Sequence, residues 1–237
     1  MENGRILIVN ADDFGHGTGV NAGVIKAHEH GIVTSASLMV RWPAATEAAD
    51  YARGRGSLGL GLHIDLGEWL PRDGGWEPVY EVVSLEDFDA VEEEVGDQLS
   101  KFRALVGSDP THIDSHQHVH TQVEPAVGVV FGCLARELAV PLRHRDPDVR
   151  YRGDLYGQTA SGAPATEAIS VGNLIEILRG LEPGVTELAC HPGEGDEVDS
   201  IYRAEREQEL RILCDPRVLE TIERERIELR SFAGLDA

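Results

Sequence analysis

The amino-acid sequence predicts an α/β fold, specifically a (β/α) barrel that has seven strands or is otherwise incomplete. Short apolar runs alternate with amphipathic helical stretches along the 237 residues, a pattern typical of a parallel sheet with crossover helices. Eight complete units fill ~250 residues in most such barrels, so we expect an incomplete one. No shift in composition divides the chain, and a single domain over residues 1–237 is expected. A doubly wound open sheet is the alternative.

The first three strands and their helices follow from hydrophobic spacing. Apolar or β-branched runs at residues 6–9, 32–40 and 58–64 predict three buried strands. Between them, apolar residues at helical spacing predict a helix over 20–30, and an alanine-rich segment after Pro43 predicts the next one.

A third unit begins at Ser84-Leu-Glu-Asp87, which resembles a capping box and precedes a helical stripe that reaches Phe102. Further strands are expected at residues 111–114, 140–144, 185–190 and 227–232. Further helices are expected at residues 126–138 and 173–181 and in two charged stretches before the last strand. The segments 68–83 and 145–168 are expected to be long loops.

Composition limits the class of partner. A formal net charge of -21 would repel phosphate backbones and anionic lipids, so we expect no nucleic acid and no membrane as partner, whereas a neutral sugar is acceptable. The cysteines Cys133, Cys190 and Cys214 are few and far apart, which favours a reducing compartment. With neither a signal peptide nor a membrane span in the sequence, a cytoplasmic location is expected.

Ionisable side chains follow four of the expected strands at the point where the apolar run stops. They are Asp12 and Asp13, His63, the segment His112–His116, and His191. Chemistry in parallel α/β domains gathers at the carboxyl ends of the strands, where these side chains would meet. No G-x-G-x-x-G spacing follows the first strand, which disfavours nucleotide binding.

Four histidines alternate with other residues in the segment His112-Ile-Asp-Ser-His-Gln-His-Val-His120. In an extended chain, a period of two places His112, Asp114, His116, His118 and His120 on one face. Imidazole nitrogen and carboxylate oxygen are the usual ligands of divalent metals, so the segment predicts a metal site at the ends of the strands.

A catalytic metal site needs three protein ligands and an open position, and Asp13, His63 and His116 form a sufficient set. Asp12 is then left as a general base, although the aspartate pair could instead serve a turn and helix entry. His191, followed by Pro192 and Gly193, is either a general acid for a leaving amine or a turn residue.

These blocks carry a resemblance to a known family. Val9-Asn-Ala-Asp-Asp-Phe-Gly15, Gly61-Leu-His63, the segment Thr111–His120 and Cys190-His-Pro-Gly193 resemble, in order along almost the whole chain, the signatures of the YdjC-like carbohydrate deacetylases, the family of chitooligosaccharide deacetylases. The resemblance implies a (β/α) barrel, a divalent metal and hydrolysis of N-acetyl groups on amino sugars, and it suggests a homodimer.

The resemblance also implies roles for single residues. Asp13, His63 and His116 match the metal ligands of the family, Asp12 its base and His191 its acid, and Arg143 resembles a basic residue that orients the base. His118, His120 and Asp114 are candidates for the wall of the site, and His118 or His120 would replace His116 if the match misleads. Strand parity predicts that Gln117 faces away from the metal.

The cofactor expected from these ligands is one divalent metal ion, Zn²⁺ or Mg²⁺, with Mn²⁺, Co²⁺ or Ni²⁺ as alternatives. The predicted function is hydrolysis of an N-acetylated sugar or oligosaccharide by metal-activated water with Asp12 as base. Two alternatives stay open, namely a metal-dependent hydrolase of another amide or ester and a non-catalytic protein that binds metal or sugar.

Overall fold

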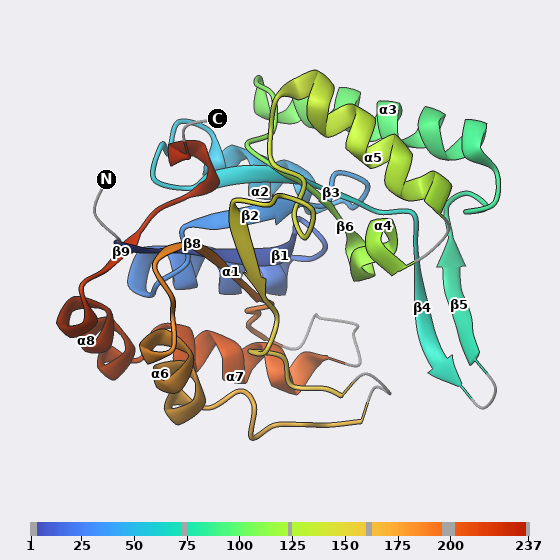
Figure 1. Ribbon diagram of the computed structural model, residues 1–237. Helices are drawn as coiled ribbons and strands as arrows, with labels where there is room; N and C mark the ends of the chain where they lie inside the picture. Colours follow the sequence, from blue (N-terminus) through green and yellow to red (C-terminus); the bar gives the residue numbers. More distant parts are fainter. Residues whose placement is uncertain (1–3, 73–74, 123–124, 160–162, 196–201, 236–237) are drawn as a thin grey trace.

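Parallel strands form the central sheet of the molecule, as Figure 1 shows. The computed structural model describes residues 4–72, 75–122, 125–159, 163–195 and 202–235, and in these residues the sheet has seven strands. Their order is β6-β3-β2-β1-β8-β7, with β9 paired to β1. The strands are β1 (Arg5–Phe14), β2 (Ser35–Leu38), β3 (Gly59–Ile64), β6 (Ile113–Ser115), β7 (Val149–Arg152), β8 (Gly184–Cys190) and β9 (Ile227–Leu229).

Strand β1 lies at the centre of this sheet. One of its edges pairs with β8 along seven residues, while the other pairs first with β9 and then with β2. Its apolar residues Leu7, Val9 and Ala11 are fully buried. At the far edge, Ile113 of β6 forms a bridge to Leu142, and the chain reaches β7 within seven residues. The sheet is therefore strongly curled, and the prediction of an incomplete parallel (β/α) barrel is confirmed.

The helices pack around this sheet and against one another. Their bounds are α1 (Thr18–His30), α2 (Ala45–Ala52), α3 (Phe88–Val106), α4 (Val119–Gln122), α5 (Pro125–Leu138), α6 (Val171–Arg179), α7 (Arg203–Leu213) and α8 (Pro216–Glu225), with short 3-10 turns η1 (His116–His118) and η2 (Phe232–Gly234). Helices α3 and α5 lie side by side, as do α6 and α8. Among the described residues, none of the helices combines the length and apolar character needed to cross a bilayer.

The prediction of a strand at residues 140–144 is wrong. Pro141 and Arg143 do exchange backbone hydrogen bonds with Ile113, but only the Ile113–Leu142 bridge forms. Residues 142–146 then turn, since the amides of Arg145 and Asp146 donate to Leu142 O. The strand at the other edge is β7, inside a segment expected to be a loop.

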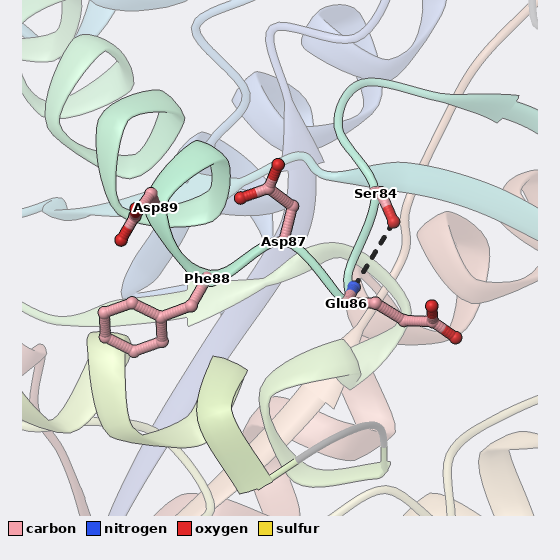
Figure 2. A pocket seen from close by; sticks show the side chains of 5 residues that line it. All are labelled: Ser84, Glu86, Asp87, Phe88 and Asp89. Atoms are coloured by element: carbon pink, nitrogen blue, oxygen red, sulfur yellow. Dashed lines mark hydrogen bonds between the residues drawn. The ribbon is translucent and has the colours of Figure 1, made fainter.

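The start of α3 also differs from the predicted capping box. Asp87 is itself the N-cap, and its side chain accepts from Ala90 N at 3.1 Å. Ser84 instead accepts a bond from Glu86 N just before the helix (Figure 2). Asp is common at an N-cap because its short side-chain oxygen can accept from the first free amides of the helix, and Asp87 does so here.

The prediction of a loop at residues 68–83 is also wrong, because this segment contains an antiparallel hairpin of β4 (Gly67–Arg72) and β5 (Gly75–Glu81). It projects from the sheet as a separate arm (Figure 1). The hairpin contacts the body at η1, the turn that holds His116. The arm therefore stands beside the carboxyl ends of the strands.

Candidate active site

The site begins with an irregularity in β1. Between Ala11 and Phe14 the register against β2 shifts by one residue, and Asp13 adopts a φ of 64°. Adjacent residues of a regular strand point to opposite faces. A β-bulge re-aims a side chain, and here both Asp12 and Asp13 line one cavity.

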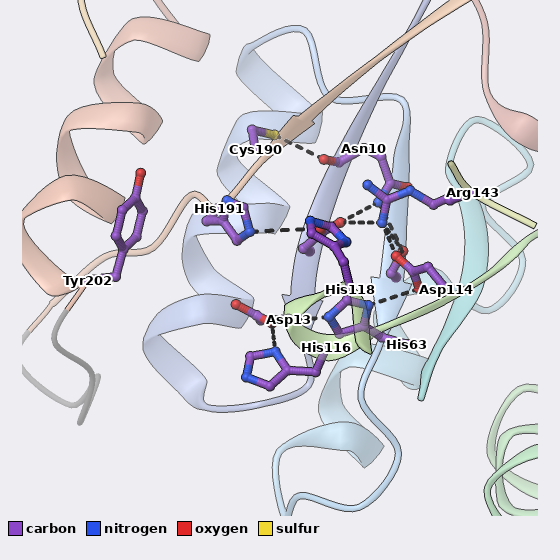
Figure 3. A network of polar contacts seen from close by, with 12 residues as sticks. Asn10, Asp13, His63, Asp114, His116, His118, Arg143, Cys190, His191 and Tyr202 are labelled. Atoms are coloured by element: carbon purple, nitrogen blue, oxygen red, sulfur yellow. Dashed lines mark hydrogen bonds and ion pairs between the residues drawn. The ribbon is translucent and has the colours of Figure 1, made fainter. Parts of the chain in front are cut away.

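Three donor side chains meet beside this bulge. Ligand atoms of Asp13, His63 and His116 all lie within 4.8 Å of one another. The Asp13 Oδ1 atom lies 3.0 Å from His116 Nδ1 and 3.3 Å from His63 Nε2. Figure 3 shows the two imidazoles turned toward this carboxylate. The arrangement offers one oxygen and two nitrogens, a donor set that suits a divalent cation.

The orientation of His63 is fixed from behind by Asp114. The Asp114 carboxylate lies 2.9 Å from His63 Nδ1, which leaves Nε2 directed toward Asp13. A carboxylate that accepts from the far nitrogen of a histidine is the usual second partner of a metal ligand. Asp114 is completely buried and lies behind the cavity instead of lining it.

Arg143 joins three carboxylates in the interior. Its guanidinium donates to Asp12 Oδ1 at 2.8 Å, to Glu187 Oε1 at 2.6 Å and to Asp114. Burial would raise the pKa of Asp12, but Arg143 and the nearby imidazole of His63 hold it below its ordinary value. Asp12 is therefore ionised at neutral pH.

Arg206 supports the neighbouring carboxylate. It comes from α7, and its guanidinium lies 2.5 Å from Asp13 Oδ2. Burial opposes ionisation of Asp13, yet Arg206 and His116 keep its pKa well below the ordinary value. Arg206 also lines the cavity, and its Nε atom is buried without a hydrogen-bond partner among the described residues.

His191 follows β8 and faces Asp12. Its Nε2 atom lies 3.7 Å from Asp12 Oδ2. Burial lowers the pKa of His191 to about 4, against the opposite effect of Asp12 and Asp13. Glu209 of α7 accepts from the His191 amide and from the Tyr202 hydroxyl, which fixes the chain at this point.

The other histidines of the cluster divide between core and cavity. His112 is buried, stacks on Phe232 at 4.1 Å and lies where any side chain at Gly61 would collide with it. His120 is also buried and bridges Ser115 to the backbone of Arg143 instead of reaching the cavity. His118 does line the cavity, 3.4 Å from the Tyr151 hydroxyl.

The predicted parity of this segment fails because β6 ends at Ser115. Beyond it the chain turns, and both Gln117 and His118 have positive φ angles of 50° and 55°. Gln117 consequently lines the cavity instead of facing away from it. Its side chain exchanges two hydrogen bonds of 2.9 Å with the backbone N and O of Trp69 in β4.

The cavity that these residues share has a volume of about 790 Å³. Asp12, Asp13, His63 and His116 line one part of it, and the other lining residues include those of the hairpin and the tyrosines Tyr151, Tyr156 and Tyr202. Sequence reasoning missed Glu187, Arg206 and the hairpin. A lone carboxylate inside the apolar run 185–190 was the available signal for Glu187, whereas Arg206 lies among many charged residues of α7.

Comparison with known proteins adds relatives of nearly equal length. The sequence model described as YdjC-like protein matches residues 6–224. A carbohydrate deacetylase of Geobacillus stearothermophilus is 32% identical, with 96% of this chain and 97% of that protein covered. A chitooligosaccharide deacetylase of Serratia marcescens is 34% identical, with 98% and 99% covered.

A solved structure is similar over the whole chain. It is a protein of Enterococcus faecalis V583 that is provisionally named for cellobiose-phosphate cleavage. The TM-score is 0.79 and the sequence identity 28%, and the match covers 99% of this chain and 100% of the other.

Proposed function

Because the chain belongs to the YdjC-like family, we propose that it removes an N-acetyl group from an amino sugar or chitooligosaccharide by metal-dependent hydrolysis. The observation that carries this proposal is the convergence of Asp13, His63 and His116 in a cavity that Asp12 also lines. The names of the relatives from Geobacillus stearothermophilus and Serratia marcescens support the substrate class.

The candidate site is rich in buried carboxylates, among them those of Asp12, Asp13, Asp114 and Glu187. The donor type also fits a divalent cation, since Asp13 offers a carboxylate oxygen and His63 and His116 each offer an imidazole nitrogen, all within 4.8 Å of one another. Asp13, His63 and His116 would hold it, with Zn²⁺ or Mg²⁺ as first choices and Mn²⁺, Co²⁺ or Ni²⁺ as alternatives. Such an ion, when bound, polarises a carbonyl and lowers the pKa of water.

Asp12 takes the proton of the attacking water in this proposal. Its Oδ1 atom already accepts from Arg143 and, at 2.7 Å, from Asn10 Nδ2. The Oδ2 atom is left to act as proton acceptor. Arg143 holds the carboxylate in place and is a positioning residue.

His191 returns a proton to the leaving amine. Its Nε2 atom lies 3.7 Å from Asp12 Oδ2, so a proton taken up by the carboxylate can reach the amine nitrogen through the imidazole. The acetamide C–N bond breaks as this nitrogen is protonated, and the products are acetate and the free amino sugar.

Acetate release is the test of the proposal. The metal-stripped protein is reloaded with Zn²⁺, Mg²⁺, Mn²⁺, Co²⁺ or Ni²⁺ and incubated with N-acetylated sugars that include chitobiose. We expect metal-dependent release, and we expect Asp12→Asn to bind metal but to lose ~10²–10⁴-fold in kcat, the span for a positioned base. Asp97→Asn, at an exposed position of α3, is the matched control with normal turnover.

Two outcomes would contradict the proposal. Normal turnover of Asp12→Asn would remove its role as base. Bound metal without acetate release from any sugar would favour another amide or ester as substrate, or a binding protein without activity.

A further inference from the structure

The cavity is larger than an acetamide group requires, and much of its wall is aromatic. Its volume of about 790 Å³ lies in the upper part of the ~300–1,000 Å³ range for small-ligand sites. Trp69, Pro71 and Trp76 of the hairpin line it, together with Tyr151 and Tyr156. A substrate longer than the reacting group therefore has a surface to contact.

The hairpin presents one apolar face. Cross-strand pairing places Pro71 opposite Trp76 and Trp69 opposite Pro78, and paired residues of an antiparallel ladder share a face. The opposite face carries the exposed ion pair of Arg72 and Glu77. The two indoles are thus on the same side of the arm.

Trp76 is 59% exposed, although it lines the cavity. Leaving a large indole in water is unfavourable, and an exposed aromatic side chain beside polar groups is typical of a ligand site. Trp69 is half-buried closer to the body, where Gln117 holds its backbone. Because Gln117 follows His116, this pair of hydrogen bonds fixes the hairpin relative to the candidate metal donors.

The chemistry of this wall suits a neutral sugar ring. One face of a pyranose consists of C–H groups that pack on an indole, while hydroxyl groups at the ring edge stay free for polar partners. Glu68 and Gln158 line the same cavity and can bond such hydroxyls. A net charge of -21 disfavours an anionic ligand here.

We infer that Trp76 forms a second sugar subsite, on which the unit next to the acetylated one stacks. This inference rests on the proposed function and implies a preference for oligosaccharides of at least two units over the monosaccharide. The acetylated unit would lie at Asp12 and His116, and the adjoining unit on the apolar face of the hairpin.

The test compares Trp76→Ala with Val79→Ala, a matched variant on the same strand, 55% exposed and absent from the cavity wall. Kinetics are measured on N-acetylglucosamine and chitotriose. We expect Trp76→Ala to raise KM for chitotriose about 5- to 10-fold, as the loss of one aromatic contact predicts, and to lower the preference for chitotriose over the monosaccharide by the same factor. Val79→Ala should keep the wild-type values.

An equal effect of Trp76→Ala on both sugars, or none on either, would overturn the subsite. If Trp76→Ala keeps KM but converts a dimer into a monomer in light scattering, the indole belongs to an interface with a second copy, and the inference fails.

Calorimetry separates this inference from the proposed function, because chitotriose binding to Asp12→Asn needs no turnover. Binding that weakens on adding Trp76→Ala, without acetate release by the wild type, would end the deacetylase proposal and keep the subsite. Acetate release with binding that ignores Trp76 would do the reverse.

Discussion

Arg143 and Arg206 are both buried beside the aspartate pair, but they differ in what surrounds them. Arg143 contacts three carboxylates and is fully enclosed. Within the part of the chain that the structure describes, Arg206 contacts one carboxylate, that of Asp13, and it borders the cavity. Burial makes a charge dependent on its partners, since water cannot replace them. The Arg143 region is therefore part of the folded framework, whereas the Arg206 region belongs to the open side of the site.

The largest difference between the Arg143 and Arg206 regions is expected in the free energy of unfolding. Arg143→Met leaves Asp12, Asp114 and Glu187 buried without their guanidinium, and losing one side of a buried ion pair costs about 3–5 kcal/mol. Arg206→Met leaves only the Asp13 carboxylate without its guanidinium, and Asp13 lies beside a cavity. This change should therefore lower the free energy of unfolding by less than Arg143→Met does. Urea unfolding of both variants measures the difference. Equal losses would show that the two arginines are held alike.

A smaller effect is expected at Asp13, where the candidate metal ligands converge. His116→Ala removes one of three donors and should reduce metal affinity by more than the ~10–100-fold that loss of a second-layer partner causes. His118→Ala, the matched change two residues later, should retain the metal. Metal content after dialysis and calorimetry distinguish them, and a reversed order would transfer the ligand role to His118.

The third prediction concerns Glu209, one turn from Arg206 on α7. Burial raises the pKa of Glu209 from its ordinary value of 4.5 to about 8. The folded protein thus holds a proton that the unfolded chain releases, so this group's contribution to stability falls as pH rises from about 4.5 to about 8. Glu209→Gln should flatten the decline in thermal unfolding scans between these pH values. An unchanged slope would mean that Glu209 is ionised in the fold.

The smallest effect is expected for an ion pair in water. Arg179 and Glu176 lie 2.9 Å apart on α6, with 47% and 71% of their side chains exposed. Glu176→Gln should change the free energy of unfolding by less than about 0.5 kcal/mol. A loss comparable to that of Arg143→Met would show that burial is not the cause of the difference between these arginines.

Much of the fold could be predicted because buried parallel strands leave a plain apolar pattern. The runs at 6–9 and 185–190 lie within strands of the sheet, and the run at 58–64 matches β3 except for its first residue. The hairpin β4–β5 could not be predicted in this way, since Trp, Pro and Gly in residues 67–81 give no clear alternation. Its position depends instead on Gln117, a contact between residues far apart in the chain.

The site was predictable where its residues follow strands. Strand ends brought Asp13, His63 and His116 to one place, because parallel strands end at a common edge. Arg206 reaches Asp13 from a helix, across nearly the whole length of the chain, and no local pattern encodes that contact. Strand parity failed at Gln117 because the strand had already ended.

Asp12 and Asp13 are adjacent in the chain, so covalent geometry fixes the distance between their Cα atoms, and the bulge turns both side chains into one cavity. Adjacent Cα atoms are always ~3.8 Å apart, so the two side chains move as one piece of backbone. Movements of the surrounding loops can change the width of the cavity, but they cannot change the distance between the Cα atoms of Asp12 and Asp13. The backbone positions of the two aspartates thus stay together when the cavity changes its width.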